Sequence, residues 1–144
     1  MQKPLIRSAV LSLTLAIACA SSLAVADDSL YQTFNEKTGI QKLVDNFFAI
    51  VLSDSRISGS FQKTDNNHIK AMLTEQFCVL LDGPCTYSGR DMASTHATLG
   101  LGNAQFNALA EDLQTAMEQM NIPFSAQNKL IAKLAPMQHQ IVVR

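Results

Sequence analysis

One histidine lies in a setting that suits a single strong bond to a metal. His96 is one of three histidines; a polar, turn-rich stretch, residues 81–91, precedes it, and Gly100 and Gly102 follow it closely. Imidazole is the commonest metal ligand in proteins. A short helical turn between loops can fix the ring from behind while the segment adapts to a bulky cofactor. The alternative is that His96 is a hydrogen-bonded residue of the core and binds no metal. Features elsewhere in the sequence are needed to distinguish the two.

The first 26 residues have the pattern of a secretory signal peptide. They combine a basic start, a short apolar run and a small-residue cleavage site: Lys3 and Arg7, residues 9–20, and Ala24-Val25-Ala26. The apolar run is too short to span a bilayer. We therefore expect a mature chain of residues 27–144 in a bacterial periplasm. Lipid attachment at Cys19 is the second alternative and an uncleaved anchor the third.

The mature chain has the size of one small domain. Removing 26 of the 144 residues leaves 118, and the net charge changes from −1 to −3 because Lys3 and Arg7 are lost. The absence of any basic patch argues against nucleic acid as a partner. No further long apolar run follows residue 26, so we expect no membrane span in the mature protein.

Two cysteines remain after cleavage and flank a turn. Cys78 and Cys85 are seven positions apart, on either side of residues 81–84. In an oxidising compartment such a pair is a candidate disulfide, and closing so short a loop would contribute about 2 kcal/mol to stability. The alternative is that they are two unrelated small residues.

Helical periodicity covers nearly everything after residue 27. Apolar residues recur at three- and four-residue spacing over residues 39–53, 66–81 and 103–120 and again from residue 125. Asn103 is the expected N-cap of the third helix, and Pro136 is expected to kink the last. No alternating strand pattern occurs, so the predicted class is all-α. The connections 54–65 and 81–94 are long for a tight bundle and would leave room for a planar guest.

Several of these segments together resemble the group I truncated haemoglobins over about residues 29–142. The resemblance is carried by Leu30-Tyr31, Asp45-x-Phe47-Phe48-x-x-Val51-Leu52, Asp54-x-Arg56-Ile57, Phe61, Asp82-Gly83-Pro84-x-x-Tyr87-x-Gly89-Arg90, Met92-x-x-x-His96-x-x-Leu99, Phe106-x-x-Leu109-x-x-Asp112-Leu113 and Ala135-Pro136. It implies a two-over-two helical sandwich around haem b.

The resemblance also assigns roles at the cofactor. His96 matches the proximal iron ligand, as expected in a globin, and Phe61 matches the phenylalanine that packs on the porphyrin face. The remaining expected cofactor neighbours are Phe48, Ile69, Leu73, Tyr87, Arg90, Met92 and Phe106, with Lys63, Thr64 and Lys70 also near the expected haem edge. One departure is the corner between the first two helices, where Asn35-Glu36 replaces the family's glycine pair.

A second departure concerns the distal side of the haem. The family commonly places a tyrosine and one or two glutamines there, whose donors hold dioxygen. The matching positions are Phe48, Ile69 and Leu73, and none of these side chains can donate a hydrogen bond. A missing donor to a charged acceptor forfeits roughly 1.5–3 kcal/mol, a tenfold to hundredfold change in binding. We therefore expect fast release of oxygen and ready oxidation of the iron.

Met72 is a candidate second iron ligand. It lies where some relatives present a histidine or lysine to the iron, and a thioether suits haem iron opposite a histidine. The alternative is that Met72 fills an apolar pocket, as flexible methionines often do. His68 is a weaker candidate, because its position on the helix points it toward solvent.

Three functional hypotheses follow. The first is binding or redox conversion of a diatomic gas (O2, NO or CO), with a nitric oxide dioxygenase-like activity as one form. The second is a six-coordinate His96/Met72 protein for electron transfer or redox sensing, which implies an electron-transfer partner. The third is a helical adapter that has kept the fold without haem.

Overall fold

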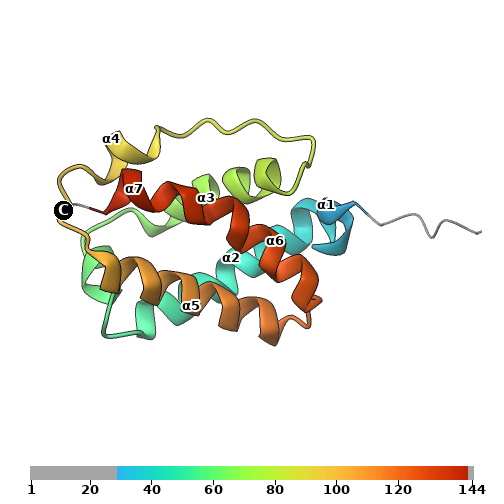
Figure 1. Cartoon of the computed structure of the whole chain (residues 1–144), viewed down its shortest axis with the longest axis horizontal. Coiled ribbons are helices and arrows are strands. Elements are labelled where there is room, and N and C mark those ends of the chain that lie inside the picture. The colour runs from blue at the N-terminus through green and yellow to red at the C-terminus, as the bar shows by residue number, and fades with distance from the viewer. Residues whose placement is uncertain (1–28, 143–144) are drawn as a thin grey trace, which may run out of the picture.

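A computed structural model describes residues 29–142 and consists of helices joined by loops (Figure 1). The helices are α1 (Leu30–Thr33), α2 (Glu36–Ser53), η1 (Ser58–Phe61), α3 (Asn66–Leu80), α4 (Met92–His96), α5 (Asn103–Gln119), α6 (Phe124–Leu134), η2 (Ala135–Met137) and α7 (Gln138–Ile141). No strand occurs over these residues, so the predicted all-α class is confirmed. The predicted signal peptide lies outside the described residues. Within 29–142, none of the helices has the length and apolar character needed to cross a bilayer.

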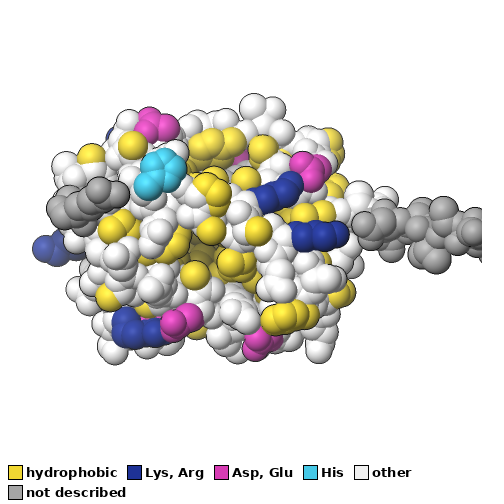
Figure 2. All heavy atoms as spheres, viewed as in Figure 1, with side chains coloured by type: hydrophobic (Ala, Val, Ile, Leu, Met, Phe, Trp, Pro, Cys, Tyr) yellow, Lys and Arg dark blue, Asp and Glu magenta, His cyan; other side chains and the backbone are white. Residues whose placement is uncertain are grey.

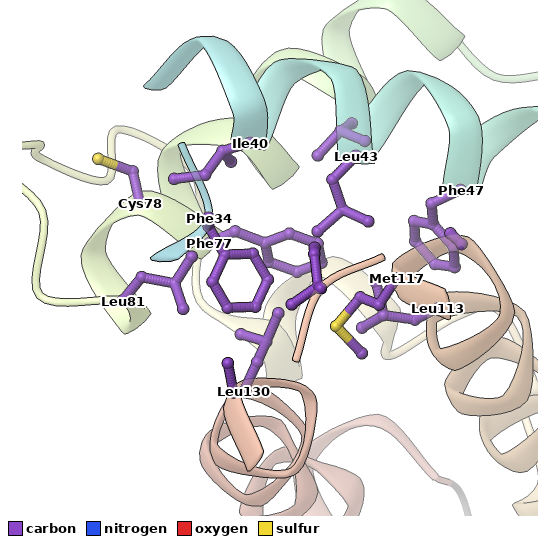
Figure 3. Packing of buried hydrophobic residues seen from close by; sticks show 14 of the residues in the cluster. Phe34, Ile40, Leu43, Phe47, Phe77, Cys78, Leu81, Leu113, Met117 and Leu130 are labelled. Atoms are coloured by element: carbon purple, nitrogen blue, oxygen red, sulfur yellow. The ribbon is translucent and has the colours of Figure 1, made fainter. Parts of the chain in front are cut away.

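The helices pack as two pairs, which is the predicted two-over-two arrangement. α2 packs against both α3 and α5, while α5 and α3 each pack against α6. The buried face of α2 supplies much of the core: Figure 3 shows Ile40, Leu43 and Phe47 pointing toward Phe77 of α3 and Leu130 of α6. This core fills the end of the sandwich near α1, where the described chain begins (Figure 1).

Two helix boundaries differ from the sequence-based expectation. α2 begins at Glu36, three residues early, because Asn35 and Glu36 adopt φ values of 56° and 57° and turn the chain directly out of α1. The prediction that Asn103 caps α5 is wrong: Gly102 is the N-cap, and its N–H donates to Gln105 Oε1 at 3.0 Å. The Asn103 side chain instead accepts a hydrogen bond from Gln138 Nε2 at 2.9 Å.

The expected kink at Pro136 is confirmed. α6 ends at Leu134, η2 contains the proline, and α7 continues as a separate turn. Proline removes a backbone donor and breaks the helical ladder. The break carries Met137 and Ile141 to the site described below, where α7 contacts α4.

Arg56 fixes the segment that leads from α2 to η1. Its guanidinium pairs with Asp54 at 2.7 Å and with Glu111 of α5, and it lies 3.8 Å from the buried Asp112. The hydrogen bond from Arg56 lowers the pKa of Asp54, whereas burial raises the pKa of Asp112. The clamp joins this segment to α5 and thereby positions Phe61 at the end of η1.

The corner at Asn35–Glu36 depends on a glycine one turn later. A Cβ added at Gly39 would overlap the carbonyl oxygen of Phe34, whereas a Cβ at Gly59 would meet nothing within 4 Å. We expect Gly39→Ala to lower the free energy of unfolding by about 1–3 kcal/mol through overpacking. The matched control Gly59→Ala should change it by less than about 1 kcal/mol. Urea unfolding curves measure both, and equal effects would contradict the assigned role of Gly39.

Candidate cofactor pocket around His96

A large cavity lies beside the His96 helix. Its volume is about 920 Å³, and every helical element except α1 contributes to its lining. Figure 2 shows hydrophobic side chains gathered around a hollow between α5 and the α6–α7 stretch of Figure 1. Cofactor sites of proteins are concave, mostly apolar and about 300–1,000 Å³ in volume, so the cavity has the size and character of one.

The backbone of α4 orients the His96 ring. Asp91 caps this five-residue helix by accepting a hydrogen bond from Ser94 N at 2.8 Å. His96 Nδ1 lies 2.7 Å from the carbonyl oxygen of Met92, one turn earlier. A carbonyl can only accept, so Nδ1 donates the hydrogen bond, and in the neutral ring Nε2 is the nitrogen with a free lone pair. His96 lines the cavity. In metal-binding histidines the second ring nitrogen commonly donates to a backbone carbonyl in the same way.

Most of the predicted site residues meet in this cavity. Its lining includes His96, Met72, Phe61, Ile69, Leu73, Tyr87, Arg90, Met92 and Phe106. Phe48 lies outside the lining: it is 3% exposed and packs edge-on against Phe61, with ring centroids 5.3 Å apart. The preceding residue, Phe47, lines the cavity instead. Phe48 therefore supports the wall from behind.

The candidate haem-edge residues divide into two groups. Thr64 lines the cavity with Tyr87 and Arg90. Lys70 instead turns away to form an ion pair with Asp45 at 2.8 Å. The hydroxyl of Tyr87 donates to the carbonyl oxygen of Arg90 at 3.0 Å, and burial raises the pKa of Tyr87.

Gln76 is a polar wall residue that the sequence prediction did not assign to the site. It is half-buried on α3, and its Nε2 lies 3.6 Å from the sulfurs of both Met92 and Met137. The amide therefore links α3 to α4 and η2 on either side of the cavity. The sequence does contain a signal for this role, because Gln76 is a polar residue on the otherwise apolar helix face of residues 69–80.

The loop between α3 and α4 is tied to α3. A disulfide joins Cys78 to Cys85, with Cα atoms 5.9 Å apart. Farther along, Ser88 donates from its backbone N–H and its hydroxyl to Glu75 Oε2, at 2.8 and 2.7 Å. These hydrogen bonds lower the pKa of Glu75.

The His96 hydrogen bond predicts an unusual tautomer in the cofactor-free protein. At alkaline pH we expect neutral His96 to carry its proton on Nδ1, because Met92 offers only an acceptor. The exposed His139 has no such partner among residues 29–142 and should show the Nε2-protonated form that free imidazole prefers. Long-range nitrogen–proton correlation spectra distinguish the two forms. An Nε2-protonated His96 would contradict the assigned geometry.

Comparison with known proteins places the chain in a family. The model of the bacterial-like globins matches residues 29–143. A group 1 truncated haemoglobin of a Synechocystis species is 35% identical over 115 residues, covering 74% of this chain and 86% of the relative. One from Mycolicibacterium paratuberculosis is 28% identical over 113 residues, covering 78% and 83%.

Solved structures agree on the fold. The truncated haemoglobin of Tetrahymena pyriformis in its Fe(III) form superimposes with a TM-score of 0.76 at 23% identity, covering 80% of this chain and 98% of that one. The 2/2 haemoglobin of a Synechococcus species gives 0.71 at 24% identity, covering 78% and 94%. The chain belongs to the bacterial-like globins and, within them, to the group 1 truncated haemoglobins, a membership that implies a haem cofactor.

Proposed function

We propose that this protein holds haem b through His96 and binds a small diatomic ligand at the iron. The observation that carries the proposal is the free Nε2 of His96, which is directed by the Nδ1 hydrogen bond to Met92 and belongs to an apolar cavity of cofactor size. The cofactor would supply the iron that binds the gas. The chain would supply the imidazole of His96 to hold the iron and an apolar wall that excludes water.

Each part of the wall has a distinct task. The carbonyl of Met92 fixes the His96 ring and raises its basicity toward a metal. Phe61, backed by the buried Phe48, offers an aromatic face for a planar ring. The apolar side chains of α3 and α5 keep water away from the reacting centre, which lowers the local dielectric.

The distal positions favour gases that need little polar assistance. Ile69 and Leu73 line the cavity and carry no donor. Nitric oxide and carbon monoxide bind without a strong hydrogen bond, whereas dioxygen acquires partial negative charge and benefits from one. Nitric oxide dioxygenation depends on retained dioxygen, so gas binding is the better-supported form of the activity.

Restoring a donor tests this distal assignment. We expect Leu73→Gln to slow dioxygen release tenfold to hundredfold, the equivalent of roughly 1.5–3 kcal/mol for a hydrogen bond to a charged acceptor. Leu73→Met is the matched control, because it keeps the volume and adds no donor. Stopped-flow displacement of dioxygen by carbon monoxide gives the rates. Equal rates in the two variants would contradict the assignment.

Met72 supports a second candidate function, that of an electron carrier or redox sensor with a partner protein. Met72 is half-buried in the same cavity lining as His96, and its sulfur has a weak contact with Ser88 Oγ at 3.9 Å. A thioether opposite a histidine raises the haem potential. The same residue also serves simply to fill the apolar wall.

The absorption spectrum of the reduced protein without added ligand separates the two functions. For gas binding we expect a high-spin, five-coordinate spectrum that shifts on adding carbon monoxide and is the same in Met72→Ala. A low-spin spectrum that becomes five-coordinate in Met72→Ala would select the electron carrier. His68→Ala is the control, since His68 is exposed at the cavity margin. Absence of Soret absorption would select the haem-free adapter.

The proposal includes export to the periplasm with cleavage after Ala26. The support is the sequence pattern of residues 1–26. The intact mass of the protein recovered from a periplasmic fraction should correspond to residues 27–144. A lipid-modified product starting at Cys19 would contradict this choice.

A further inference from the structure

The helix that carries His96 has few attachments to the rest of the protein. α4 is five residues long and lies between two stretches without helix, residues 81–91 and 97–102. On its C-terminal side the chain is loosely held: Leu99 is 51% exposed, and Gly100 adopts a φ of 62°. α4 packs against α7. The position of His96 therefore depends on the α7 contact, on the Gln76–Met92 contact and on what holds the 81–91 loop.

After the turn that ends α3, in which Gly83 N–H donates to the carbonyl oxygen of Cys78 at 2.8 Å, two further ties hold this loop to α3. One is the disulfide between Cys78 and Cys85, and the other is the pair of hydrogen bonds from Ser88 to Glu75. A third contact, from Lys133 to Asp82 at 2.8 Å, lies at the surface and contributes little. In Figure 1 the loop runs along the edge of the molecule from the end of α3 to α4. The ties named above hold it at Asp82, Cys85 and Ser88.

The same loop forms part of the cavity wall. Tyr87, Ser88, Gly89 and Arg90 all line the cavity, and Ser88 reaches Met72. Releasing the loop would loosen this wall and the His96 helix together. No other disulfide joins the described residues, so the Cys78–Cys85 bond is the one covalent cross-link that holds this loop to α3.

We propose that the Cys78–Cys85 disulfide is a thiol-sensitive latch that controls how firmly the protein retains its haem. This inference rests on the proposed function. With the disulfide intact, the loop and α4 close the cavity and the haem is kept. With it reduced, the loop opens more often and haem passes to an acceptor. The protein then acts as a haem donor whose release is triggered by a dithiol reductant.

The reduction follows ordinary thiol–disulfide exchange. A thiolate of the dithiol attacks the sulfur of the half-buried Cys85, the S–S bond breaks, and the fully buried Cys78 leaves as a thiolate that takes up a proton. The second thiol of the reductant then attacks the mixed disulfide and frees the Cys85 thiol. Two electrons and two protons move to the protein, and the reductant becomes a cyclic disulfide.

Hydrogen exchange on the haem-free protein tests the latch without the cofactor. We expect reduction by dithiothreitol to speed amide exchange in residues 83–96 by about tenfold or more, because a short covalent loop no longer limits local opening. Exchange in α2 and α5 should stay unchanged. Unchanged exchange in residues 83–96 would overturn the latch.

Haem transfer to excess apomyoglobin tests the consequence. Loaded with ferric haem, Cys85→Ser should release haem about tenfold faster than the disulfide-bonded protein, since opening becomes more frequent. Glu75→Gln, which weakens the second tie, should give a smaller acceleration. The matched control Glu118→Gln makes the same change on an exposed position of α5 and should release haem at the wild-type rate.

The two failures are distinguishable. Equal transfer rates in Cys85→Ser and the parent protein, with haem bound in both, would overturn the latch and leave the proposed function standing. Failure of the parent protein and every variant to bind haem would overturn both. If Cys85→Ser does not fold, the exchange measurement on the reduced parent protein decides.

Discussion

The hydrogen bond between His96 Nδ1 and the carbonyl oxygen of Met92 is the interaction on which the site depends. It commits one ring nitrogen to the backbone and leaves the other, in the neutral ring, without a proton, as the proposed function requires. It also lies within a single turn of helix, so the ring is oriented locally even though α4 is short. The rest of the fold has the task of bringing that turn to the edge of a cavity and keeping it there.

The surrounding helices perform this task by separating core from cavity. Residues such as Leu43 and Leu130 are fully buried and hold α2 and α6 together at one end. At the other end the helices diverge, and the proline break after α6 returns the chain toward α4. An apolar volume this large is costly to leave filled with water, so the fold is suited to a large apolar guest.

Much of this arrangement is readable from sequence because it rests on periodic patterns. Three- and four-residue spacing predicts the long helices, and the family resemblance around Met92 and His96 predicts that this short turn lies beside the cavity. The sequence-based predictions were wrong or incomplete where a side chain forms a contact that another residue was expected to make, or that no residue was expected to make. Gln105 satisfies the start of α5, so Gly102 becomes the cap in place of Asn103. Phe48 packs only against the far side of Phe61 and does not line the cavity. Gln76 contacts the sulfurs of two methionines at the cavity wall. Residue spacing alone predicts neither contact.

The iron–imidazole bond can be observed directly in the ferrous protein by resonance Raman spectroscopy. The account predicts an iron–histidine stretching band that vanishes in His96→Gly and returns when imidazole is added to that variant, because the cavity would admit the free ring. An undiminished band in His96→Gly without imidazole would show that another residue holds the iron and would contradict the central claim.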